Sequence, residues 1–149
     1  MPRLQVGLRR LGRHEGRPTP AAGVFRTGGP GSEAVATPIT ADAQPSFYVA
    51  SRGHHADIGG STPGSMPPFS TTIDEEGVLF DNFLLVRDGQ LRETALLEQL
   101  RSGPYPARNP QQTIADLRAQ IAANEKGVQE LRAMVAQFGR DTVAAYMQH

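Results

Sequence analysis

The chain has 149 residues, and its 15 Lys and Arg side chains are balanced by 15 Asp and Glu side chains, so the formal net charge is zero. This balance argues against generic nucleic-acid binding, which needs an excess of basic side chains. The absence of Cys excludes disulfides, thiolate metal ligands and cysteine nucleophiles. No apolar run reaches about 18 residues, and no signal-peptide pattern is present, so we expect no membrane partner and a cytoplasmic location.

Residues 1–45 are rich in Arg, Gly and Pro and have no sustained hydrophobic period. Up to Arg26 there are six Arg and one acid, Glu15, which gives a local charge of +5. We expect this segment to be irregular, either disordered or foreign to the domain, and residues 1–34 to be mobile; a targeting segment and a basic binding patch are the alternatives. We place the start of the folded domain at residue 46.

The middle of the chain predicts short strands separated by a long loop. Phe47–Ser51 is a β-prone run after a proline. The prolines and glycines that follow, up to Pro68, forbid a helix and predict a loop. Val78–Arg87 and Gln90–Arg92 predict a hairpin, because the Asp-Gly pair between them suits a tight turn with positive φ.

The rest of the chain has helical periodicity. Thr94–Leu100 predicts a short helix with its leucines on one face. Asn109 followed by proline predicts the start of a long helix that runs to about Phe138 and stops at Gly139. Asp141 predicts the cap of a last helix. The fold class is therefore α+β: short strands and a Pro/Gly-rich loop, then a mainly helical C-terminal part, with a poorly ordered N-terminus.

The apolar residues of the long helix form a heptad seam in which Asn124 occupies one position. Such a seam favours a core face, and a partner-binding helix is the alternative. The polar residue is expected to fix the register or to meet another polar group.

His54, His55 and Asp57 form the one dense cluster of metal-ligand side chains. Neighbouring residues of an extended segment point to opposite faces, so one His and Asp57 would share an ion. A catalytic zinc usually takes three protein ligands, so others would have to come from elsewhere. From the residues alone, hydrogen bonding within a Gly-rich loop and partial metal binding both stay open.

Arg52, Gly59 and Gly60 suggest a loop that receives a substrate or another anion, because glycines allow close backbone approach and Arg supplies several donors. An ordinary turn is the alternative. The sequence contains no nucleotide-phosphate fingerprint and identifies no catalytic residue.

The segment FYVASRGHHADIGGSTPGSMPP at residues 47–68 resembles the hydantoinase B/5-oxoprolinase family. The resemblance continues through STTIDEEGVLFDNFLLV at 70–86, SGPYPARNPQQTIADLRAQIAANEKGV at 102–128 and VAAYM at 143–147. It covers residues 46–149 and is closest to the ATP-dependent 5-oxoprolinases. N-methylhydantoinase B subunits and acetone- or acetophenone-carboxylase subunits share the same domain.

The resemblance implies a hydrolase of glutathione metabolism that acts on a small cyclic amide. In that family ATP phosphorylates the amide oxygen of 5-oxo-L-proline, and water opens the ring to give glutamate. ATP would be bound by a hydantoinase A-like domain or subunit absent from this chain. The resemblance also implies a divalent metal ion (Zn, Mn or Mg) with His54 and Asp57 as ligands and His55 nearby.

Two departures from the family pattern shape our expectations. Family members are several times longer, and they carry a GG-[ST]-H-x-x-D element shortly before the FYVASRGHHAD strand. Here that region reads GGPGSE at residues 28–33 and lacks the His. We therefore expect a fragment of a 5-oxoprolinase-type hydrolase that is inactive alone. A subunit of another member type and a non-enzymatic helical interaction fragment are the alternatives.

Overall fold

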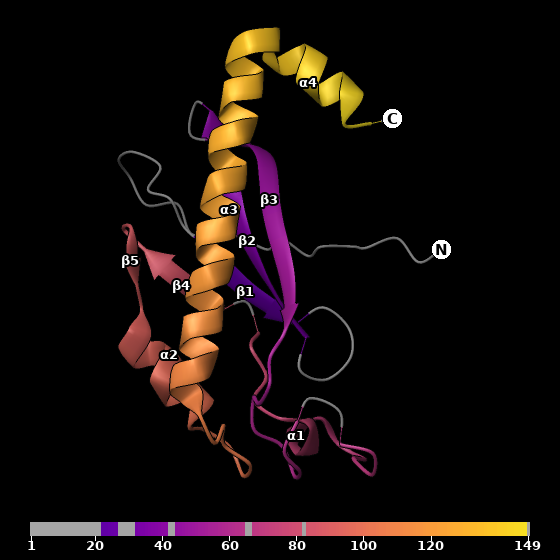
Figure 1. Ribbon diagram of the computed structural model, residues 1–149, viewed down its shortest axis with the longest axis vertical. Coiled ribbons are helices and arrows are strands. Elements are labelled where there is room, and N and C mark those ends of the chain that lie inside the picture. The colour runs from indigo at the N-terminus through magenta and orange to yellow at the C-terminus, as the bar shows by residue number, and fades with distance from the viewer. Residues whose placement is uncertain (1–21, 27–31, 42–43, 65–66, 82, 149) are drawn as a thin grey trace.

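The computed structural model describes residues 22–26, 32–41, 44–64, 67–81 and 83–148, which form one antiparallel sheet and four helices (Figure 1). The strands are β1 (Ala22–Arg26), β2 (Ser32–Ala41), β3 (Gln44–His54), β4 (Phe83–Arg87) and β5 (Gln90–Leu91), in the sheet order β3-β2-β1-β4-β5. The helices are α1 (Ile73–Glu76), α2 (Glu93–Leu100), α3 (Pro110–Phe138) and α4 (Arg140–Tyr146). The predicted mixture of short strands followed by helices is confirmed.

Helix α3 lies across β2 and β3, and α2 packs beside its first turns (Figure 1). The core between these elements is apolar, and Leu85, Leu96 and Leu117 in it are fully buried. Burial of such side chains contributes about 1.5–3 kcal/mol each. The buried cluster is formed by Val35, Val78, Phe80, Leu85, Val86, Leu96, Leu100, Ala107, Ile114 and Leu117.

Strands β1 and β2 lie within the segment that was expected to be irregular. In β2, Val35, Thr37 and Ile39 are buried at every second position, which is the period of a strand with one face on the core. The proline between the last two hides this short alternation in the sequence. The expected domain start at residue 46 falls inside β3. The expectation of mobility for residues 1–34 falls mainly on residues 1–21 and 27–31, which lie outside the described part.

The predicted hairpin forms between β4 and β5, with positive φ at Asp88 (52°) and Gly89 (75°). Its first strand begins at Phe83 rather than at Val78, because Val78 and Phe80 contribute side chains to the core without strand pairing. The predicted short helix is α2, which begins one residue earlier, at Glu93.

The long helix begins and ends as predicted. The Asn109 side chain accepts a hydrogen bond from the Gln112 N–H at 3.4 Å, and the C-cap is Gly139. Its seam is a core face as far as Val128, with Ile114, Leu117 and Val128 buried, whereas Phe138 at its end is exposed. The next helix was predicted to be capped by Asp141, but α4 begins at Arg140 directly after Gly139.

Helix α1 was not predicted; its four residues, IDEE, are too few for a helical period to show in the sequence. None of the helices in the described residues combines the length and the apolar character needed to cross a membrane.

Candidate functional site

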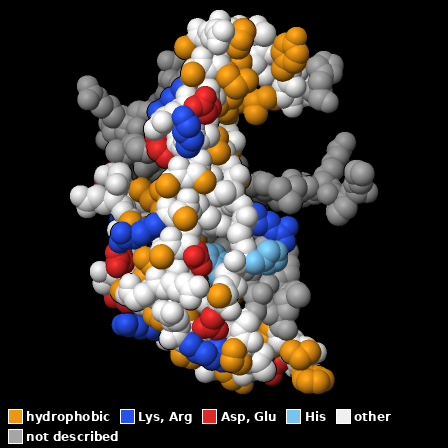
Figure 2. All heavy atoms as spheres, in the orientation of Figure 1, with side chains coloured by type: hydrophobic (Ala, Val, Ile, Leu, Met, Phe, Trp, Pro, Cys, Tyr) orange, Lys and Arg blue, Asp and Glu red, His pale blue; other side chains and the backbone are white. Residues whose placement is uncertain are grey.

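The two histidines at the end of β3 have different environments. His54 is the last residue of the strand and is exposed, whereas His55 is buried with 3% exposure. These are the histidines among the described residues, and Figure 2 shows pale-blue histidine surface beside the lower half of α3. The alternation follows from the extended backbone, which turns neighbouring side chains to opposite sides.

His55 faces a carboxylate on α3. Its Nδ1 lies 3.5 Å from Oδ2 of Asp116, a contact that is longer than an ordinary hydrogen bond. Neither ring nitrogen has a hydrogen-bond partner among the described residues. Burial lowers the pKa of the His55 imidazole below its ordinary value, and the nearby Asp116 carboxylate opposes that shift only in part.

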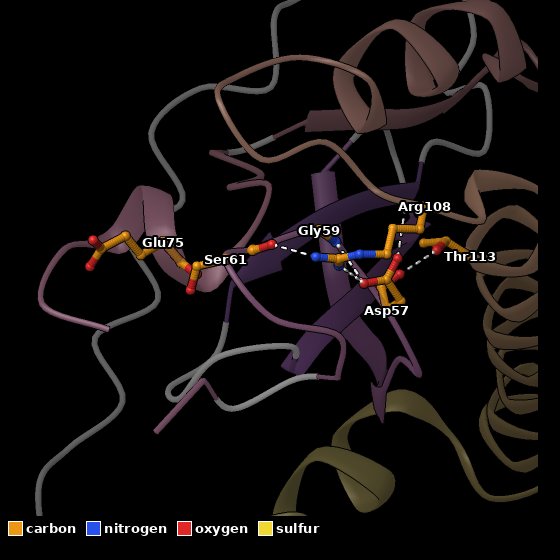
Figure 3. Close-up of polar contacts among 7 residues, drawn as sticks. Asp57, Gly59, Ser61, Glu75, Arg108 and Thr113 are labelled. Atoms are coloured by element: carbon orange, nitrogen blue, oxygen red, sulfur yellow. Dashed lines mark hydrogen bonds and ion pairs between the residues drawn. The ribbon is translucent and has the colours of Figure 1, made fainter. Parts of the chain in front are cut away.

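Asp57 is held by Arg108, in the segment that leads into α3. Its two carboxylate oxygens accept hydrogen bonds from the Arg108 side chain (Nη1 to Oδ1) and backbone N–H (to Oδ2), each at 2.7 Å (Figure 3). The buried Thr113 hydroxyl donates to the Asp57 carbonyl at 3.1 Å. Arg108, just before α3, therefore fixes the side chain of Asp57, and Thr113 in the first turns of α3 fixes its backbone.

The Gly59-Gly60 pair packs directly against the 105–107 backbone. Both residues have positive φ, and a Cβ at Gly59 would lie 2.2 Å from the Tyr105 carbonyl oxygen. The Gly60 N–H donates to that carbonyl, and the Gly59 N–H donates to the Asp57 carboxylate. Both N–H groups thus have partners within the chain, and an anion-binding role for Arg52, Gly59 and Gly60 stays a prediction.

The other side of this loop is fixed by α1. The Ser61 N–H donates to the Glu75 carbonyl at 2.8 Å, and the Val78 N–H donates to the Ile58 carbonyl at 2.9 Å. The Arg108 side chain also donates to the Gly60 carbonyl at 2.8 Å, opposite the α1 side of the loop (Figure 3). Residues 57–61, named here the clamped loop, are therefore fastened between α1 and the start of α3.

The described side chains do not make a complete metal site. Within the described ranges, no group of three or more His, Asp and Glu side chains is arranged to hold an ion. The Asp57 carboxylate is already bonded to Arg108, and His55 is directed toward Asp116. The strand register places Ser32 opposite His54, next to the region that lacks the expected His. The ligand set His54, His55 and Asp57 stays a prediction.

The sequence interpretation missed Arg108, Thr113 and Asp116. Thr113 and Asp116 share a helix face with Asn124, where the spacing places polar side chains beside the apolar seam. That polar stripe was the available signal. Arg108 lies before the helix cap, and no sequence signal marks it, because its partner Asp57 is 51 residues away.

Residues 33–149 match the family described as Hydantoinase B/oxoprolinase. The chain belongs to this family. The match includes β3, the clamped loop and α3, and it begins before residue 46, where we expected the domain to start.

Curated relatives agree with this membership. The chain is 48% identical over 115 residues to 5-oxoprolinase of Dictyostelium discoideum, covering 77% of this chain and 9% of that protein. It is 40% identical over 126 residues to 5-oxoprolinase 1 of Arabidopsis thaliana, covering 77% of this chain and 10% of that protein. The chain thus spans about a tenth of the length of these relatives.

The fold also resembles that of the ATP-dependent caprolactamase from Pseudomonas jessenii, with a TM-score of 0.68 and 24% identity. The similarity covers 88% of this chain and 23% of the caprolactamase chain.

Proposed function

We propose that the chain works as part of a 5-oxoprolinase-type hydrolase, which uses ATP to open the lactam of 5-oxo-L-proline to glutamate. The observation that carries the proposal is the family match, which spans the end of β3, the clamped loop and α3. The identity of 48% to a 5-oxoprolinase favours this substrate over other cyclic amides.

The proposal includes a hydantoinase A-like domain or subunit that binds ATP. The sequence carries no nucleotide-phosphate fingerprint, so the nucleotide step is assigned to that partner. By itself the 149-residue chain should hydrolyse neither ATP nor 5-oxo-L-proline. Turnover by the purified chain above that of a His54→Ala control would contradict this assignment.

A chimera tests the proposed function directly. Residues 33–149 would replace the matching segment of the Dictyostelium enzyme, which keeps its own upstream residues. We expect glutamate formation that depends on ATP, and its loss in the same chimera carrying His54→Ala. Glu98→Gln, on the exposed side of α2, is the matched control. A folded chimera that forms no glutamate would refute the proposal.

Metal binding by this chain should be weak, because the described residues offer no complete ligand set. In the register, position 32 lies opposite His54, so Ser32→Asp would put a carboxylate next to that residue, and Gly29→His would restore the H-x-x-D spacing in the sequence. Calorimetry with Zn²⁺ or Mn²⁺ should show stronger binding by this double variant, and His54→Ala should remove the gain.

The role of Asp57 in metal binding can be tested in the same Gly29→His/Ser32→Asp double variant. If it is a ligand, Asp57→Ala should weaken metal binding while Arg108→Ala leaves it unchanged. If it only positions the clamped loop, both substitutions should weaken binding alike, because each breaks the same contact. The cytoplasmic location and the division of the chain at residue 45 stay predictions.

A further inference from the structure

The buried imidazole of His55 poses a specific chemical question. Its side chain is 1% exposed, and neither nitrogen has a hydrogen-bond partner among the described residues. A neutral imidazole carries a proton on one nitrogen and a lone pair on the other. Buried polar atoms in folded proteins nearly always have partners, so the two nitrogens need an explanation.

The nearest charged group decides between the two tautomers. Oδ2 of Asp116 lies 3.5 Å from Nδ1. A proton on Nδ1 directs a positive N–H dipole at the carboxylate, whereas a proton on Nε2 turns the Nδ1 lone pair toward it. The imidazole is buried and the Asp116 side chain is 44% exposed, so water screens this electrostatic difference only in part, and it favours the proton on Nδ1. His54 is adjacent in the chain but exposed, so water screens its effect.

We infer that Asp116 is a positioning residue that holds His55 as the Nδ1–H tautomer and leaves Nε2 as a buried, unprotonated nitrogen. Nε2 then accepts a hydrogen bond from an N–H or O–H donor that the described residues do not supply. Only a role for the Nε2 acceptor in the reaction, next to His54, would depend on the proposed function. The tautomer itself is a property of the chain without ATP or lactam.

The test is nitrogen NMR of the 149-residue chain with ¹⁵N-labelled histidine, at pH about 8.5, roughly two units above the ordinary histidine pKa. Long-range proton–nitrogen correlations distinguish a protonated ring nitrogen from an unprotonated one. The His55 signals are assigned by removing the others singly, with His14→Gln, His54→Gln and His149→Gln. We expect protonated Nδ1 and unprotonated Nε2 at His55.

Asp116→Asn should abolish this preference and give a mixture of tautomers, whereas Asp116→Glu, which keeps the carboxylate, should retain it. Asp116 has a side chain that is 44% exposed, so these changes should not prevent folding. Glu125→Gln removes an exposed acid from the same helix and should leave the His55 signals unchanged. A purely structural role would alter the melting temperature without changing the tautomer. Protonated Nε2 in the parent chain, or an unchanged tautomer in Asp116→Asn, would overturn the inference.

Discussion

The carboxylate of Asp57 and the side chain of Arg108 lie 2.7 Å apart, although 51 residues separate them in the sequence. The contact joins the loop after the edge strand to the start of the longest helix. Asp57 has a side chain that is only 16% exposed, so the contact is partly shielded from solvent. The contact therefore holds the clamped loop in place against the start of α3, whatever further role the carboxylate has.

We expect Arg108→Ala to lower the free energy of unfolding by about 1–3 kcal/mol, because it leaves a partly buried carboxylate without its side-chain donor. Asp57→Ala should have a similar effect, and the double variant should cost much less than the sum of the two. Urea denaturation of the four proteins measures this coupling. Arg101→Ala, at the exposed end of α2, is the control. Additive effects would mean that the pair does not act as a unit.

A second prediction concerns Asn124, which is 1% exposed and donates to the Val35 carbonyl at 2.8 Å. Asn124→Asp keeps the shape but replaces this donor with a carboxylate that faces a carbonyl oxygen. We expect a loss of about 3 kcal/mol at pH 7, since the new charge is buried and unpaired. Gln111→Glu makes the same chemical change on an exposed turn of α3 and should alter stability by less than about 0.5 kcal/mol. Equal stability of the two variants would count against the contact.

The close approach of α3 to β3 at Gly127 gives a third prediction. A Cβ at this position would lie 2.9 Å from a methyl carbon of Val49. Gly127→Ala normally stabilises a helix by about 1 kcal/mol, but here we expect a net loss because of the steric clash. In a Val49→Ala background the same substitution should become stabilising. Thermal denaturation of the parent, the two single variants and the double variant tests this prediction. A stabilising effect of Gly127→Ala in both backgrounds would disprove the close packing.

The fourth prediction concerns pH and Glu75. Hydrogen bonds from the Thr71 N–H (2.6 Å) and Thr72 N–H (3.1 Å) hold the pKa of Glu75 below its usual range. Because the folded-state pKa is the lower one, the stabilisation is complete above the unfolded-state pKa of about 4.3 and is lost as the pH falls through the folded-state value.

The melting temperatures of the parent chain and Glu75→Gln should therefore differ at pH 7 and converge as the pH falls below about 4. Asp74→Asn removes the neighbouring carboxylate without touching these bonds, so it should not reproduce this convergence. A gap between parent and Glu75→Gln that stays constant across this pH range would contradict the assignment.

The sequence predicted best the elements that are specified locally. Asn109, Pro110 and Gly139 mark both ends of α3 in the sequence, and the Asp88-Gly89 pair specifies the hairpin turn. Strand β2 was missed because its alternation is short and contains a proline. It pairs with β3 across residues 42–43 only, and the Asp-Ala sequence there lacks the glycine that is typical of a tight hairpin turn.

The candidate site was predicted only in its linear part. His54, His55 and Asp57 could be identified because they are neighbours in the sequence. Their partners Asp116 and Arg108 come from a helix and the segment before it, and their placement depends on how that helix crosses the sheet. No spacing rule connects residues that far apart.

Burial along α3 is uneven, and this has a consequence for how the molecule opens. The helix buries residues from Thr113 to Val128 against the sheet, whereas Met134 and Phe138 are 47% and 54% exposed. Helix α4 adds one buried side chain at this end, Val143, while Figure 2 shows apolar side chains gathered on the surface there. Amide hydrogens within the buried stretch from Thr113 to Val128 should thus exchange with solvent only when the whole domain unfolds. Those beyond Val128 should exchange through local fraying, so a single continuous helix behaves as two kinetic units.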